Sequence, residues 1–160
     1  MGDEHRYSEI FVPDCGALLD IRVFNVTVGD WQSLLDFLSA NYFLAYLEDG
    51  IVQELPRFSI IRQTQKEKAL TLQILLPGFT VNMHFFVDDE IEMDVLPEDV
   101  NSFEKADAVF ALIKSVAHLL KKEVLLVEET SICDPEELKR IAVCLCDPSD
   151  LEIRYISQSD

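Results

Sequence analysis

Apolar and polar residues alternate along much of the chain, and a period of two is typical of β-strands with one buried face. In the first such stretch Leu19, Ile21 and Val23 share one face, and the residues between them share the other. The same pattern predicts nine strands. They span residues 18–26, 42–47, 51–55, 58–62, 70–76, 79–87, 91–96, 123–127 and 151–155.

Apolar residues at spacings of three and four predict helices between these strands. The first helix begins at Thr27, where Asp30 completes a variant of the capping box, and it runs to about residue 40. The longest helix covers residues 102–122, and Asn101 is its expected cap. Both helices carry an apolar stripe wide enough to pack on a sheet.

A third helix is predicted near the end of the chain. Asp134 is its cap and Pro135 takes the first helical position. Leu138, Ile141 and Leu145 give this helix a buried side.

Short turns join the strands that follow one another in the chain. Asp49-Gly50 is typical of a tight hairpin, and Pro77-Gly78 of a turn. Consecutive strands with short turns pair antiparallel. The sequence therefore predicts an α+β fold, an antiparallel β-meander sheet with helices packed on one face, in the order β-α-β(6)-α-β-α-β.

The hairpin around residues 88–90 allows a sharper prediction, about register. A three-residue loop there places Phe85 opposite Met93 on the apolar face. The same register places His84 opposite Asp94 on the polar face, where a cross-strand pair contributes roughly 0.2–1 kcal/mol.

Length and composition indicate one domain over residues 1–160. The chain has 160 residues, of which 49 % are hydrophobic, so a full core is available. Residues 1–16 are expected to be loosely ordered and residues 157–160 to form a polar tail. No run of 18 apolar residues and no secretory pattern occurs, so we expect no membrane partner and a cytoplasmic location.

Charge narrows the range of partners. Thirty acidic residues against thirteen basic ones give a net charge of −17. Such a surface repels phosphate backbones, which disfavours nucleic acid, and it attracts basic proteins. The alternative is that the excess acid only keeps the protein soluble.

The acidic residues are densest in one segment, and between Ala69 and Glu104 there is no Lys or Arg. Positive charge near this segment must come from elsewhere in the fold or from a partner. A solvated face, a protein-docking surface and a metal or carboxylate catalytic site all remain open, although the spacing required of a calcium loop is missing. The predicted partner-binding residues are Asp88, Asp89, Glu90, Glu92, Asp94, Glu98 and Asp99.

Motifs that carry chemistry are missing from the sequence. It contains no glycine-rich phosphate loop, no nucleophile elbow and no zinc-binding histidine pair. His84 is read as a cross-strand partner, His118 as a cation near a helix C-terminus, and His5 as part of the N-terminus. We therefore expect no catalytic residue, cofactor or metal. Reduced, structural thiols are expected at Cys15, Cys133, Cys144 and Cys146.

Four features together resemble small bacterial immunity-type proteins, which neutralise toxins of contact-dependent or secreted systems. The likeness spans roughly residues 18–129 and carries no functional residue. The features are the first strand, the helix start Gly29-Asp30-Trp31 with its leucines, the acidic strand Glu90–Val95, and the long helix leading into the segment Val124–Glu129.

Two functional hypotheses follow. The first is a non-enzymatic binding protein, for example an immunity or inhibitor protein, that docks a basic partner through acidic surface. The second is a small-molecule binder or enzyme of helix-grip type, with a cavity between a curved sheet and the long helix. A large pocket would favour the second hypothesis, and a filled interior the first. Aromatic residues that could line such a cavity are Phe79, Phe85, Phe86 and Phe110.

Overall fold

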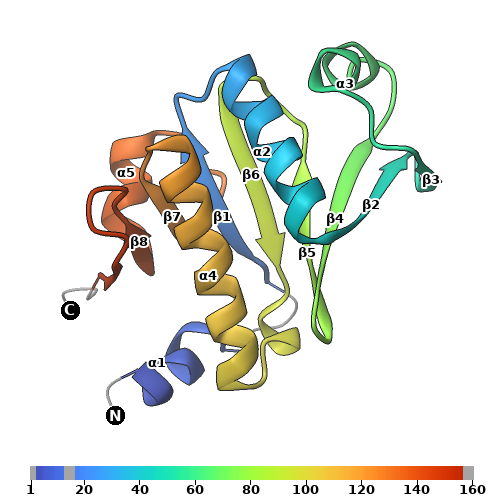
Figure 1. Ribbon diagram of the computed structural model, residues 1–160. Helices are drawn as coiled ribbons and strands as arrows, with labels where there is room; N and C mark the ends of the chain where they lie inside the picture. Colours follow the sequence, from blue (N-terminus) through green and yellow to red (C-terminus); the bar gives the residue numbers. More distant parts are fainter. Residues whose placement is uncertain (1–2, 13–16, 157–160) are drawn as a thin grey trace.

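The computed structural model describes residues 3–12 and 17–156 of the chain. Over these residues one antiparallel sheet of nine strands is flanked by helices, so the α+β class and the antiparallel sheet are confirmed (Figure 1). The strands are β1 (Leu19–Phe24), β2 (Phe43–Glu48), β3 (Ile51–Gln53), β4 (Leu70–Leu76), β5 (Phe79–His84), β6 (Glu90–Val95), β7 (Val124–Glu128), β8 (Cys144–Cys146) and β9 (Ile153–Tyr155).

The strand order is β3-β2-β4-β5-β6-β1-β7-β8-β9, which departs from a simple meander. The first strand of the chain, β1, lies between β6 and β7 and pairs antiparallel with both. It can occupy this central place because five of its six residues are buried. The segments from β2 to β6 therefore form one wing of the sheet, and β7 to β9 the other.

The two long helices, α2 (Val28–Asn41) and α4 (Phe103–Leu120), lie on the same face of the sheet (Figure 1). The capping box of α2 is present as predicted, since Thr27 and Asp30 bond to each other's backbone N–H. The cap of α4 differs from the prediction. Ser102, rather than Asn101, accepts the bond from the Lys105 N–H, and Asn101 accepts from the Lys105 side chain instead.

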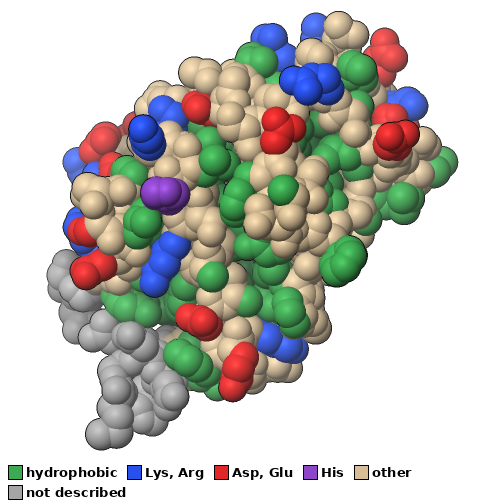
Figure 2. Space-filling view, in the orientation of Figure 1, with side chains coloured by type: hydrophobic (Ala, Val, Ile, Leu, Met, Phe, Trp, Pro, Cys, Tyr) green, Lys and Arg blue, Asp and Glu red, His purple; other side chains and the backbone are tan. Residues whose placement is uncertain are grey.

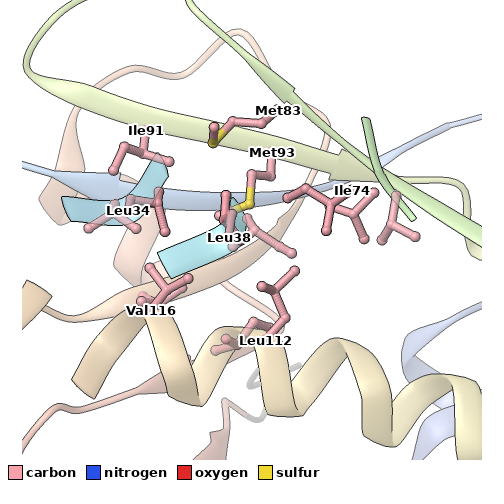
Figure 3. Close-up of a cluster of buried hydrophobic side chains, with 14 of the residues drawn as sticks. Leu34, Leu38, Ile74, Met83, Ile91, Met93, Leu112 and Val116 are labelled. Carbon is pink, nitrogen blue, oxygen red and sulfur yellow. The ribbon is translucent and has the colours of Figure 1, made fainter. Parts of the chain in front are cut away.

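A packed core fills the space between these helices and the sheet. Figure 3 shows Leu34 and Leu38 of α2 and Leu112 and Val116 of α4 directed toward strand residues such as Met93. All of these side chains are fully buried. Full burial of a large aliphatic side chain contributes about 1.5–3 kcal/mol, so this layer is the main source of stability.

A third helix, α5 (Pro135–Ile141), covers the opposite face of the sheet. Leu138 of α5 is buried against Leu125 and Val127, whereas the alternating residues Val124 and Leu126 face the other core. Strand β7 is thus covered on both faces. The expected one-sided arrangement holds for α2 and α4 but not for α5.

The predicted strand at residues 58–62 is wrong, because this segment forms helix α3 (Phe58–Thr64). Phe58 and Ile61 are buried at a spacing of three, and Phe58 stacks on Trp31 at 4.9 Å. The backbone N–H of Phe58 donates to the side chain of Gln32, which closes the start of the helix. A five-residue stretch of mixed polarity does not by itself distinguish a short helix from a strand.

Two further segments differ from the sequence prediction. Residues expected to be irregular form helix α1 (Asp3–Ile10), and Tyr7 and Phe11 pack on aromatic rings of α4. The α5 helix ends at Ile141, and Leu145 lies in β8 rather than on a helix. A short 3₁₀ turn, η1 (Pro97–Asp99), joins β6 to the approach to α4. The predicted tail at residues 157–160 lies outside the described residues.

Candidate functional site

The face of the sheet turned away from α2 and α4 carries a concentration of polar side chains. We call it the polar face, and in Figure 1 it lies behind the strands. Acidic and basic groups are interspersed on the opposite, helix-bearing side (Figure 2). The polar face consists of Asp20, Arg22, Thr71, Gln73, Asn82, His84, Glu90, Glu92 and Asp94.

Strand register arranges these residues in rows. In one row Asp20 of β1 lies opposite Asp94 of β6, which lies opposite Asn82 of β5. In the next row Arg22 lies opposite Glu92, which lies opposite His84. Three carboxylates from two neighbouring strands therefore stand side by side, and such neighbours repel one another when ionised.

Arg22 is the buried cation of this face. Its Nε donates to Oε1 of Glu90, and its guanidinium lies 5.4 Å from the centre of the Phe24 ring. Burial raises the pKa of Glu90, while the bond from Arg22 opposes that rise. The orientation of Arg22 is thus determined by Glu90 and Phe24.

His84 and Asp94 form the second ion pair. Nε2 of His84 bonds to Oδ2 of Asp94, and Asn82 donates to Oδ1 of Asp94 at 3.3 Å. Phe86 stacks on the imidazole at 5.0 Å. The hydrogen bond to Asp94 raises the pKa of His84 above its ordinary value, although burial opposes it.

The predicted contact between His84 and Asp94 is therefore confirmed, but the predicted register is wrong by two residues. His84 pairs with Glu92 and Met83 with Met93, so the bond to Asp94 is diagonal. The loop between β5 and β6 contains five residues, 85–89, instead of the predicted three. Strand β5 ends at His84 because Phe85 turns into the core against Trp31, at 5.4 Å. A shift of two residues keeps every side chain on its predicted face.

Asp20 stands out among the carboxylates. It is only 4 % exposed, and among the described residues no side chain or backbone group donates a hydrogen bond to its carboxyl. Burial raises its pKa from 3.8 to about 7, with further increases from Glu92, Asp94 and Glu129 and a smaller opposing effect from Arg22.

The seven predicted partner-binding acids fall in three places. Asp88 accepts from Arg62 Nε at 2.6 Å and from Gln65 at 3.3 Å, next to α3, and Asp89 is exposed beside it. Glu90, Glu92 and Asp94 lie on the polar face, and Glu98 and Asp99 are exposed in η1 at the far end of β6.

The acidic segment itself contains no cation, and its positively charged partners come from other parts of the chain. Arg22 pairs with Glu90, Arg62 with Asp88 and His84 with Asp94. Asp20 and Arg22 were not predicted as site residues. Their alternation in the first strand shows that they face away from the core, but only the pairing of β1 with β6 brings them to the acidic segment.

Other candidate groups lie away from this face. Cys144 and Cys146 are buried on the helix side, and burial raises the pKa of Cys144 to about 12. Cys133 is exposed, and Cys15 lies outside the described residues. His118 is in the last turn of α4, and His5 is in α1.

Among residues 3–12 and 17–156 no group of three or more His, Cys, Asp or Glu side chains is placed to hold a metal ion. Over the same residues no helix has the length and apolar character needed to cross a membrane. No protein-family model, curated protein or solved structure matches the chain.

Proposed function

We propose that the protein is a non-enzymatic binding module that docks a basic protein partner on its polar face. The observation that carries this proposal is the side-by-side placement of Asp20, Glu92 and Asp94 on a face that neither α2 nor α4 covers. Four carboxylates share this face with one guanidinium and one imidazole. The excess of negative charge is relieved when a cationic surface approaches.

Exposed apolar side chains on the same side of the sheet support a protein partner. Phe43 of β2 lies opposite Leu75 of β4 on the same side of the sheet, and these side chains are 83 % and 42 % exposed. Phe86, beside His84, is also exposed. Acidic groups speed the encounter with a basic protein, whereas buried apolar groups stabilise the complex.

An immunity or inhibitor protein is the most concrete form of this proposal, and the resemblance in element order supports it. Such a protein binds a basic enzyme and keeps it inactive. The interior between α4 and the sheet favours this hypothesis over a helix-grip binder, because Phe79 and Phe85 are buried in the packed core. Phe86 lies outside that core, and Phe110 is half-buried on α4.

The experiment isolates the partner with the wild-type protein and then measures its association rate. Glu92→Lys reverses a charge in the middle of the polar face. Asp107→Lys changes the net charge equally on an exposed position of α4, on the other side of the sheet. We expect Glu92→Lys to slow association about tenfold or more and Asp107→Lys to change it little.

Salt provides a second readout in the same experiment. At physiological ionic strength the Debye length is about 8 Å, and it shortens as salt is added, so association of the wild-type protein should slow markedly. If both substitutions slowed association equally, only the net charge of the protein would determine the association rate. A partner whose association ignores both salt and Glu92→Lys would contradict the proposal.

A further inference from the structure

An open cleft lies between helix α3, the first turn of α2 and the loop that joins β5 to β6. Its volume is about 450 Å³, and small-molecule sites have volumes of roughly 300–1,000 Å³. Val28 of α2 and Asp88 of the loop line the cleft together with α3 and the turn that follows α3. Among the described residues that line it, none belongs to the polar face.

The α3 side of the cleft is polar. Four side chains that line it occur at positions i, i+3, i+4 and i+7, a spacing that places them along one side of a helix. They are Ser59, Arg62, Gln63 and Lys66. The backbone N–H of Lys66 bonds to the carbonyl of Gln63, so the turn after α3 continues this side. The buried residues Phe58 and Ile61 lie on the other side of α3, against the core.

Trp31 of α2 fixes the parts of the cleft relative to one another. Its ring stacks on Phe58 at 4.9 Å, which holds α3 against α2. Its Nε1 donates to the backbone carbonyl of Asp88 at 2.8 Å, which holds the loop against α2. The Trp31 side chain is fully buried. Contacts inside the protein therefore form the cleft, and a preformed site loses little conformational entropy when a ligand binds.

The cleft combines available hydrogen-bond donors with an acid that is already bonded. The two carboxylate oxygens of Asp88 accept from Arg62 Nε at 2.6 Å and from Gln65 at 3.3 Å. This pair orients the guanidinium of Arg62, whose five N–H donors allow it to bond a second acceptor. The side chains of Ser59, Gln63 and Lys66 have no hydrogen-bond or ion-pair partner among residues 3–12 and 17–156.

The charge of the cleft is opposite in sign to that of the whole chain. Arg62 and Lys66 contribute two positive charges against the single negative charge of Asp88, whereas the chain has a net charge of −17. Guanidinium and ammonium groups bind phosphate and carboxylate groups through charge-assisted hydrogen bonds. The rest of the surface repels anions, so an anion would be held by direct contacts inside the cleft.

We propose that this cleft binds a small organic oxyanion, a phosphate monoester or a carboxylate, between Arg62 and Lys66. The side chain of Val28, which is 42 % exposed, contacts the apolar part of the ligand. Asp88 is a positioning residue that directs Arg62 toward the oxyanion. This inference goes beyond the proposed function, because the site, the ligand and the sign of its charge all differ from those of the polar face.

The test uses three small probes built on one benzene ring. Phenyl phosphate and benzoate carry the two kinds of oxyanion, and benzyl alcohol is their uncharged match. Each probe is titrated into the isotope-labelled protein at low ionic strength, and the amide signals of residues 28, 59–66 and 88 are followed by NMR. We expect at least one anion, but not benzyl alcohol, to shift these signals with affinity in the millimolar range. The anion that binds more tightly identifies the class of ligand.

Lys66→Gln and Arg62→Gln each remove one positive charge at an exposed position, so the fold should be retained. Each should weaken binding of the preferred anion about tenfold, because one charge-assisted hydrogen bond is lost. Lys68→Gln is the matched control. It removes the same charge two residues away from Lys66, but the Lys68 ammonium group lies 3.9 Å from Glu48 and does not line the cleft. It should have little effect on affinity.

Three results would overturn the oxyanion site. They are the absence of shifts with both anions, shifts confined to other elements, and equal losses of affinity in Lys66→Gln and Lys68→Gln. Each of these results leaves docking on the polar face intact, because that function is tested with Glu92→Lys at a separate site.

Discussion

At the scale of single residues, the charged groups of the polar face differ in their partners. Arg22 and His84 each have a carboxylate partner, whereas Asp20 has none among the described residues. The pKa values of Asp20, Glu90 and His84 are all raised. All three groups therefore hold protons more tightly in the folded protein than in the unfolded chain.

The first prediction concerns pH and stability. A group with a raised pKa binds more protons in the folded state, so the free energy of unfolding falls as the pH rises between its unfolded and folded values. For Asp20 this window runs from 3.8 to about 7. His84 contributes its full stabilisation below pH 6.5. This contribution is lost as the pH rises through the higher pKa that His84 has in the folded protein.

Asp20→Asn tests this directly. At pH 8 the variant should be more stable than the wild type by about 2–4 kcal/mol, and near pH 4 the difference should disappear. Denaturant unfolding of both proteins at a series of pH values measures this difference in stability. A variant that is less stable than the wild type at pH 8 would show that Asp20 stabilises the fold.

The second prediction compares two arginines. Arg22 and Glu90 are both largely buried, whereas Arg62 and Asp88 are exposed or half-exposed. Removing one partner of a buried pair costs about 3–5 kcal/mol, because the other charge remains buried. Removing an exposed pair costs about 0–1 kcal/mol. Chemical denaturation of Arg22→Met and Arg62→Met should reproduce this difference, and equal losses would contradict the burial of Arg22.

At the scale of elements, the sequence predicts periodic segments well and short or mixed ones poorly. The strand alternation of β1, β4, β5 and β6 and the stripe of α4 are long enough to be unambiguous. The capping box at Thr27 and the hairpin at Asp49-Gly50 are present, since Asp49 and Gly50 both have positive φ. Helix α3 and strand β8 were mistaken because tertiary contacts of Phe58 and Cys144 decide their conformation.

The third prediction tests the position of α5. The sequence places Leu138 and Ile141 on the same buried side, but in the structure Leu138 is fully buried and Ile141 is 40 % exposed. Leu138→Ala should lower the free energy of unfolding by about 2–5 kcal/mol and Ile141→Ala by less than about 1 kcal/mol. Comparable losses at both positions would contradict the exposure of Ile141.

At the scale of the whole molecule, the candidate site arises from strand order. The acidic segment is visible in the sequence, but its neighbours Asp20 and Arg22 come from about seventy residues earlier in the chain. Local periodicity determines the face on which each side chain lies. It does not determine which distant strand lies beside β6, because that pairing depends on how the whole sheet buries its apolar face. The face of each acid was therefore predictable, and the cluster was not.

The most direct test of the central claim is the footprint of the isolated basic partner on the protein. Amide chemical shifts of the labelled protein are compared with and without the partner. We predict that the largest changes fall on β1, β5 and β6 and extend to Phe43 and Leu75, while the exposed residues of α2 and α4 remain unchanged. A footprint centred on α2 and α4, with the polar face unaffected, would contradict the account.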